Sequence, residues 1–475
     1  MDNNTGSKKS PITFVIAVMA TVCASLVAAQ DIVPVSDIGG GTSVFVFRGA
    51  SRAVAKKFVA PARTRRTKME RIESAKKVTN QYATLSKTAP RRTRTAAVDP
   101  NDSRMAKIKT MPREEASKLF AGVGEYYMFT KQGKTQEAIS MLDLMIKDEP
   151  NNAAAIYQRA AAYETAGQTD KATAGYKKAV EIDPNYVPAW FQIGVAAYNR
   201  GDYKTALNAY QNVVRIQPDN YTAQANLAST YRQLERYSEA NAAYKAAEPG
   251  NLKNPDHYSE WGFCLGKTNE WDNAIARLLT ARELSPTAVD NTNLGWAYYN
   301  AAKLDKKNGN EEAAKAKFEQ ARTYLNTAVK QDPKLDAAYL NLGSTNNEVG
   351  DHEAAVTALN TALALHTGWV IAYNQLGLGY RGLNKLDLAI TALNAAVNLD
   401  GNYIPGLYNL GSTQYAAGKK DDAKKTQARL QKLDKQLAIQ LGNVIAGKLI
   451  DYGIKKATDK VPVKVPVKIP KFPFN

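Results

Sequence analysis

The chain has 475 residues, of which 44% are hydrophobic and 23% are charged. This composition is typical of a protein that buries a core, and it excludes a collagen, a coiled-coil rod and a fully disordered chain. The formal net charge is +18, but residues 44–118 carry 20 Lys and Arg against 6 Asp and Glu, whereas residues 119–437 carry 34 of each. The excess positive charge is therefore confined to the ends of the chain.

The N-terminus has the pattern of an export signal. Lys8 and Lys9 precede an apolar run at residues 12–29, and small residues at positions 27–29 offer a cleavage site before Gln30. We predict a signal peptide at residues 1–29 and an exported protein, either periplasmic or secreted. Because the apolar run of 18 residues lies near the lower limit for a bilayer span, an uncleaved anchor in the inner membrane is the alternative. Both interpretations place the rest of the chain outside the cytoplasm.

Residues 30–118 differ in composition, and we interpret them as a basic low-complexity arm or linker. A glycine-rich stretch at residues 39–43 and a short apolar run at residues 44–47 lead into the basic part. Two interpretations remain open: a solvated linker, or an arm that binds an anionic envelope polymer or lipid. Export and the scarcity of aromatic residues for base stacking argue against nucleic acid. The candidate arginines of this arm are Arg63, Arg65, Arg66, Arg71, Arg91, Arg92 and Arg94.

The middle of the chain is periodic. Small residues recur at intervals of 34, as do prolines, and such a period is the signature of helix-turn-helix units that stack because no unit can bury its apolar face alone. We therefore predict an all-α array. The residues that carry the period are Ala138, Ala172, Ala206, Ala240 and Ala274, together with Pro150, Pro184 and Pro218.

The periodic region resembles the tetratricopeptide repeat family, which implies a right-handed α-solenoid. One full copy of the family pattern consists of Tyr373, Leu376, Gly377, Tyr380, Ala389 and Leu393. Small residues such as Gly194 and Gly377 let two helices approach closely, and large residues fill the gap one turn further on. Glycines at the turn between paired helices should adopt the left-handed conformation; they are Gly133, Gly167, Gly201, Gly350 and Gly418.

Counting in this frame predicts an array of about nine units over residues 119–437. The units are 119–152, 153–186, 187–220, 221–254, 255–287, 288–335, 336–369, 370–403 and 404–437. The sixth unit carries an insertion of about fourteen residues near 303–317, which is charged and helix-forming, so we expect two lengthened helices there. Apolar residues at helical spacing then predict a capping helix at 438–458, and the prolines of 459–475 predict an extended, cationic tail.

The residues of catalytic chemistry are sparse. His257, His352 and His366 are isolated from one another, and no pattern of a metal site is present. Cys264 lies in an apolar stretch and is expected to be a core residue. We predict no enzyme activity, no cofactor and no metal. The competing class, an enzyme built from residues of distant repeats, would require clustered titratable groups that the sequence does not show.

One position of the repeat suggests a binding site. The residue just before the Leu-Gly pair of each first helix is an amide in seven of eight units. The family resemblance implies that this position faces a concave groove, where an asparagine ladder can hold the backbone of an extended peptide. Hydrogen bonding between neighbouring helices is the alternative role. The row consists of Gln158, Gln192, Asn226, Glu260, Asn293, Asn341, Gln375 and Asn409.

Large residues flank this amide row and are the second set of candidates for peptide contact, although several could instead belong to the core between repeats. They are Tyr157, Phe191, Phe263, Trp296, Tyr299, Arg381, Tyr408 and Tyr415. The sequence therefore predicts a non-catalytic scaffold or assembly factor of the cell envelope, which binds a protein or an extended peptide in its concave groove. The alternative is an envelope-surface tether whose basic arm binds anionic lipid or polymer and whose array is mainly structural.

Overall fold

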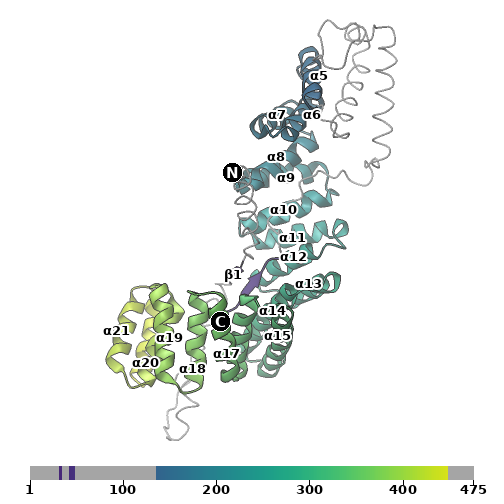
Figure 1. Ribbon diagram of the computed structural model, residues 1–475. Helices are drawn as coiled ribbons and strands as arrows, with labels where there is room; N and C mark the ends of the chain where they lie inside the picture. The colour runs from purple at the N-terminus through teal and green to yellow at the C-terminus, as the bar shows by residue number, and fades with distance from the viewer. Residues whose placement is uncertain (1–31, 35–41, 49–134, 448–475) are drawn as a thin grey trace, which may run out of the picture. The chain divides into compact units, whose positions relative to one another are not determined.

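The computed structural model describes residues 32–34, 42–48 and 135–447 (Figure 1). The predicted signal peptide, the arginines of the arm, Gly133, the first helix of the first unit and the tail lie outside the described residues. The chain divides into two compact bodies, of which one contains residues 52–252 and the other contains residues 1–51 together with 253–475. We call their described parts the N-terminal array and the C-terminal array.

The N-terminal array consists of consecutive α-helices and one short 3-10 helix. Their bounds are α5 Thr135–Asp148, α6 Ala153–Thr165, α7 Thr169–Ile182, α8 Val187–Asn199, α9 Tyr203–Ile216, α10 Tyr221–Gln233, α11 Tyr237–Ala247 and η1 Glu248–Gly250.

The C-terminal array continues the same alternation of helices. Their bounds are α12 Pro255–Lys267, α13 Trp271–Leu284, α14 Ala288–Lys307, α15 Glu311–Gln331, α16 Asp336–Val349, α17 His352–Leu365, α18 Val370–Gly382, α19 Leu386–Leu399, α20 Ile404–Ala416, α21 Lys420–Gln431 and α22 Lys435–Ile445. The predicted all-α class, built from consecutive helix pairs, is confirmed. None of the described helices is both long enough and apolar enough to cross a membrane.

Small residues allow the two helices of a pair to touch. A Cβ atom added at Gly377 on α18 would lie 2.5 Å from Leu393 on α19, and one added at Gly194 on α8 would lie 2.6 Å from the ring of Tyr210 on α9. Both distances are too short for real carbon atoms, so only glycine fits opposite these large side chains. The repeating contact of a small residue with a large one explains why the pattern of the sequence gives a regular stack.

The turns within the pairs are left-handed, with or without glycine. Gly167, Gly201, Gly350 and Gly418 have φ between 76° and 87°, as expected from the sequence. In three other units the turn residue is Glu235, Asn269 or Asn384, with φ between 57° and 64°. A side chain in this region crowds the backbone, at a cost of roughly 1–2 kcal/mol.

These turns allow a matched test of backbone strain. Replacing Glu235 with glycine should raise the free energy of unfolding by about 0.5–1 kcal/mol, because relief of strain outweighs the greater freedom of glycine in the unfolded chain. Gly201→Ala should lower it by about 1 kcal/mol, since a Cβ atom there would meet no neighbour within 4 Å and only the backbone conformation is affected. Urea denaturation measures both changes, and equal effects of the two substitutions would contradict this account.

The inserted residues of the sixth unit extend both of its helices. Helix α14 has 20 residues and α15 has 21, whereas α16 and α17 of the next unit have 14 each. The extension is stabilised by packing of Phe318 against Tyr299 and by an ion pair of 2.9 Å between Lys317 and Asp305.

The last described helix covers the end of the C-terminal array. Leu437 and Leu441 of α22 pack into a cluster with Leu407, Leu410 and other residues of α19, α20 and α21. The helix begins at Lys435, three residues before the predicted start. Ile439, although apolar, is 60% exposed, because residues 437, 441 and 444 supply the buried stripe of this helix.

Two short strands accompany the C-terminal array. Strand β1 (Ile32–Pro34) pairs antiparallel with β2 (Val44–Val46), with Ile32 opposite Val46 and Pro34 opposite Val44. The assignment of residues 42–48 to a linker was therefore wrong, because β2 lies against α14 and α16. The side chains of residues 42–48 have apolar and polar partners in the C-terminal array, which a solvated linker would lack.

Candidate functional site

Two asparagines of the amide row hold the backbone of β2. The side-chain amide of Asn341 accepts a hydrogen bond from the N–H of Val44 at 2.7 Å and donates one to the carbonyl of the same residue at 2.7 Å. Asn293 does the same for Val46, at 2.8 and 2.7 Å. Both asparagines are 0% exposed. Each amide thus replaces the edge of a neighbouring strand, and neither interaction depends on the side chain of the bound residue.

The N-terminal end of the bound segment, residues 42–48, is held by polar side chains. Ser344 on α16 donates a hydrogen bond of 2.6 Å to the carbonyl of Thr42. The Thr42 and Tyr299 hydroxyl groups are 3.0 Å apart, and Asn300 donates to the Ser43 hydroxyl at 3.1 Å. These contacts satisfy the polar groups where the segment enters the groove.

An aromatic cluster receives one face of the segment. Phe45 lies 4.9 Å from Phe263 on α12 and 4.9 Å from Trp296 on α14, measured between ring centroids. Phe47 lies 5.0 Å from Phe263 and 5.1 Å from Phe45. The tilted and edge-on geometries are those that aromatic quadrupoles favour. Phe263 and Trp296, two of the large residues that flank the amide row, therefore contact the segment directly. Tyr299 contacts it through its hydroxyl group.

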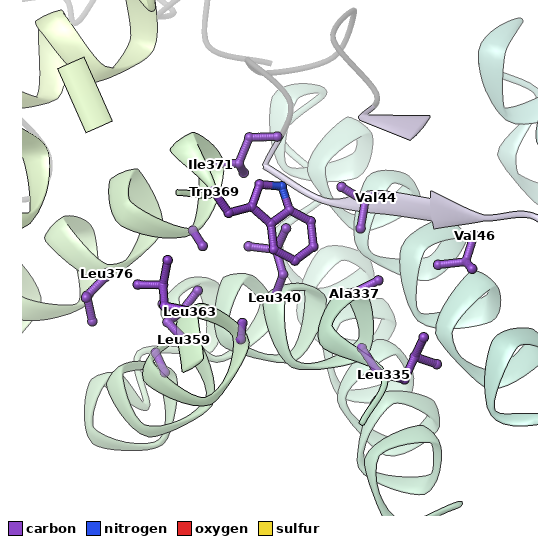
Figure 2. Packing of buried hydrophobic residues seen from close by; sticks show 14 of the residues in the cluster. Val44, Val46, Leu335, Ala337, Leu340, Leu359, Leu363, Trp369, Ile371 and Leu376 are labelled. Atoms are coloured by element: carbon purple, nitrogen blue, oxygen red, sulfur yellow. The ribbon is translucent and has the colours of Figure 1, made fainter. Parts of the chain in front are cut away.

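Aliphatic side chains receive the other face. Val44 and Val46 are fully buried in a cluster that includes Leu335, Ala337 and Trp369 (Figure 2). Burying four side chains, these valines with Phe45 and Phe47, contributes on the order of 6–12 kcal/mol as an upper bound. The segment is therefore held by apolar burial, with the amides selecting an extended backbone.

The segment runs opposite to the order of the units. Thr42 contacts α16, Val46 contacts α14, and Arg48 contacts the first turns of α12 and α14. Successive clamped residues are two apart, because alternate residues of a strand present their N–H and C=O groups to the same edge. The other edge, at Phe45, faces Val33 of β1. The site is a groove formed by α12, α14 and α16.

Two other members of the row serve the array itself. Asn409 on α20 donates a hydrogen bond of 2.9 Å to Asn374 on α18. Asn347 on α16 donates to the backbone carbonyl of Gln375 at 2.9 Å and to its side-chain oxygen at 3.3 Å. Bonding between helices, the alternative role given above, therefore describes these two positions in this structure, and their contact with a peptide stays a prediction.

The remaining positions of the row differ in burial. Asn226 and Glu260 are buried, while Gln158 and Gln192 in the N-terminal array are half-buried. The side chains of Gln158 and Gln192 make no hydrogen bond within the described residues. Glu260 on α12 holds the same position of the repeat as Asn293 on α14.

Several flanking candidates belong to the packing of the array. Tyr157 packs 5.5 Å from Tyr176, and Phe191 packs edge-on to Tyr210 at 5.9 Å. Arg381 donates a hydrogen bond of 2.9 Å to Ser412. Tyr408 is buried in the cluster that α22 forms with α19, α20 and α21. Tyr415 is half-buried, and the ammonium group of Lys420 lies over its ring. These side chains take part in contacts within the arrays, and their contact with a peptide stays a prediction.

A charged cluster lies beside the entry of the segment. Glu348 accepts hydrogen bonds from Lys303 at 2.9 Å and Lys306 at 2.8 Å. Burial raises the pKa of the Glu348 carboxyl, but the two ammonium groups outweigh it and lower that pKa to about 2. Burial raises the pKa of the neighbouring Tyr299 hydroxyl to about 12, so it stays protonated. The charges of this cluster are therefore paired within it.

The histidines, the cysteine and the acidic residues of the described part of the chain were candidates for a metal site. No three His, Cys, Asp or Glu side chains among them gather where they could hold a metal ion. Cys264 is buried, as predicted. His366 lies 3.0 Å from Asp336, and His352 lies 3.4 Å from Asn347.

The buried His257 should make stability depend on pH. Burial, with a smaller effect of Arg277, lowers its pKa from 6.5 to about 4. The unfolded chain therefore binds this proton at higher pH than the folded chain does. The contribution of neutral His257 to the free energy of unfolding is fully present above about pH 6.5 and is lost as the pH falls towards 4. The total loss is about 3 kcal/mol. Urea unfolding between pH 7 and 4 should show a weaker pH dependence for His257→Phe; an unchanged dependence would contradict this assignment.

The amino-acid sequence contained a signal for the bound segment that composition concealed. Residues 42–48 read Thr-Ser-Val-Phe-Val-Phe-Arg, so that four apolar residues stand between two hydroxyl residues and one arginine. A short, continuous apolar run of β-branched and aromatic residues is consistent with a strand that is buried on both faces. The surrounding basic residues made this short run resemble part of a solvated linker.

Comparisons with known proteins agree with the helical repeat. Tetratricopeptide repeat models match residues 129–194, 191–253 and 306–368, and 370–403. A tetratricopeptide repeat protein from Parabacteroides merdae is similar at 15% identity and a TM-score of 0.45, over 55% of this chain and 98% of that one. The APC/C hetero-tetramer Cut9-Hcn1 matches at 15% identity and a TM-score of 0.43, over 73% and 66%.

YrrB, described as a TPR protein with an unusual peptide-binding site, matches at 16% identity and a TM-score of 0.33, over 42% of this chain and 97% of that one. None of the curated proteins compared with the chain matches it.

Proposed function

Since the chain belongs to the tetratricopeptide repeat family of protein-interaction scaffolds, we propose that it is a non-catalytic adaptor that binds an extended peptide segment in the groove of α12, α14 and α16. The observation that carries this proposal is the pair of reciprocal amide contacts made by Asn293 and Asn341 to the backbone of residues 44 and 46. An amide clamp recognises any extended chain, while the pockets on either side select side chains.

The chain's own residues 42–48 occupy this groove, so a partner has to displace them. The apparent affinity for a partner is then reduced by the fraction of molecules in which the groove is open. Displacement exchanges one set of equivalent backbone bonds for another, so the partner needs only better side-chain contacts or a higher local concentration. In this proposal the bound segment acts as a built-in competitor.

A peptide competition in the full chain tests the proposal. Val46→Pro removes the N–H that Asn293 accepts and should free the groove. A labelled peptide with the sequence of residues 42–48 should then bind at least tenfold more tightly to Val46→Pro than to the unsubstituted chain, as measured by fluorescence anisotropy.

The controls use the amide row itself. Adding Asn293→Ala and Asn341→Ala to the Val46→Pro chain should abolish peptide binding, whereas Asn409→Ala should preserve it because Asn409 bonds Asn374. Circular dichroism verifies that each variant keeps its helices. Equal peptide affinity in all variants would show that the groove is not the binding site.

We also propose that the adaptor works outside the cytoplasm, as an assembly factor of the cell envelope. The support is the export pattern at residues 1–29. N-terminal sequencing of protein from its native host should begin at Gln30. An intact N-terminus in a membrane fraction would instead indicate an anchored protein.

A further inference from the structure

A charged pocket at the far end of the groove binds the guanidinium group of Arg48. The Nε atom donates to Asp256 at 3.0 Å, and Nη1 donates to the backbone carbonyl of Ser285 at 3.1 Å and to Asp290 at 2.5 Å. The Arg48 side chain is 11% exposed, and that of Asp290 is 1% exposed. The guanidinium group thus lies between the buried carboxylate of Asp290, the 50% exposed carboxylate of Asp256 and a backbone carbonyl. These acceptors come from the first turn of α12 and the α13–α14 corner.

The pocket is held in place by helix capping. Thr287 and Asp290 form a reciprocal capping box at the start of α14, in which the second carboxylate oxygen of Asp290 accepts bonds from the Thr287 N–H at 3.0 Å and from its hydroxyl at 2.5 Å. The oxygen that faces Arg48 is therefore fixed in direction before a ligand arrives. A carboxylate buried to this extent requires a cation nearby, because an uncompensated buried charge is strongly unfavourable.

The backbone clamp by itself leaves the register of a ligand undefined. An amide pairs with any residue, so a strand could shift by two residues and keep all four bonds to Asn293 and Asn341. A shift of that size would remove Arg48 from between Asp256 and Asp290. Its position two residues after Val46 consequently selects one register, in which aromatic side chains also meet Phe263 and Trp296.

We infer that Asp256, Asp290 and the Ser285 carbonyl form an arginine-selective subsite that sets the register and chooses the partner. The partner is a protein segment that binds extended, with two aliphatic residues at the clamped positions, aromatic residues after each, and an arginine last. This inference rests on the proposed function, and it adds the class of ligand. Arginine fits because its planar fork directs separate N–H groups to separate acceptors, whereas lysine presents one compact ammonium group.

Three peptides test the inference on the full Val46→Pro chain. Each has the sequence of residues 42–48 and ends in arginine, in lysine or in citrulline, which keeps the shape of arginine without its charge. The arginine peptide should bind at least tenfold more tightly than either of the others. Asp256→Asn should remove most of this preference. Asp387→Asn, which makes the same charge change at an 86% exposed side chain paired with Lys419, should leave the preference intact.

The outcomes separate the inference from the proposed function. Equal binding of the three peptides would overturn the arginine subsite while peptide binding in the groove stands. Failure of all three to bind would overturn both. A measurement without added peptide is independent of Val46→Pro: in the otherwise unsubstituted chain, Arg48→Lys and Arg48→Ala should each accelerate hydrogen exchange in residues 43–47 at least tenfold. Unchanged exchange in both variants would also overturn the subsite.

Discussion

Replacing Asn293 and Asn341 together with alanine is expected to release residues 42–48 from the groove and to lower the free energy of unfolding by several kcal/mol. Four hydrogen bonds to Val44 and Val46 disappear, and a buried N–H or C=O group that loses its partner costs about 1–3 kcal/mol. The loss in the free energy of unfolding cannot exceed what binding of the segment contributes to it. The segment leaves the groove once the bound state is less favourable than the released state.

Hydrogen exchange and thermal unfolding measure this effect directly. The amides of residues 43–47 should lose protection in the double variant, and the melting temperature should fall. Asn409→Ala is the matched control, because Asn409 belongs to the same row but bonds Asn374 and should leave that protection unchanged. Full protection of residues 43–47 in the double variant would show that apolar packing alone holds the segment.

The second large effect is expected from a charge placed between helices of the N-terminal array. Ala206 on α9 is 0% exposed, so Ala206→Asp would bury a carboxylate without a partner and cost about 3–5 kcal/mol. Because repeat units contact mainly their neighbours, hydrogen exchange should accelerate in α8, α9 and α10 while α16 and α17 stay protected.

An exposed position on the same helix provides the control for this substitution. Asn208→Asp adds the same charge at an exposed residue of α9, and it should change the free energy of unfolding by less than about 0.5 kcal/mol. If Ala206→Asp instead removed protection from the whole chain in one step, the two arrays would form a single cooperative unit.

The amide row illustrates how far a sequence pattern extends into function. All eight positions share one register, and the family resemblance suggested one role for them. Asn293 and Asn341 hold an extended backbone, but Asn409 donates its hydrogen bond to Asn374 on the neighbouring helix α18. The two roles differ because a different residue faces the amide from the neighbouring helix. The spacing of the repeat does not predict which residue that is.

The aromatic candidates divide in the same way. Phe263, Trp296 and Tyr299 contact the bound segment, while Phe191 packs against Tyr210 inside the N-terminal array. A large side chain on a repeat helix satisfies either environment, since both are apolar. Composition and spacing therefore identified the set from which the site is drawn, and the tertiary contacts chose its members.

The amino-acid sequence by itself determined the helical repeat, the glycine turns and the lengthened sixth unit, because each depends on residues within one unit or between neighbouring units. The tertiary structure alone decided what fills the groove. Val44 and Asn341 are separated by 297 positions, and Val46 and Asn293 by 247. No local period links such residues, and they meet only after the helices have stacked, when two unpaired amides, an aromatic cluster and a buried carboxylate face a strand of matching pattern.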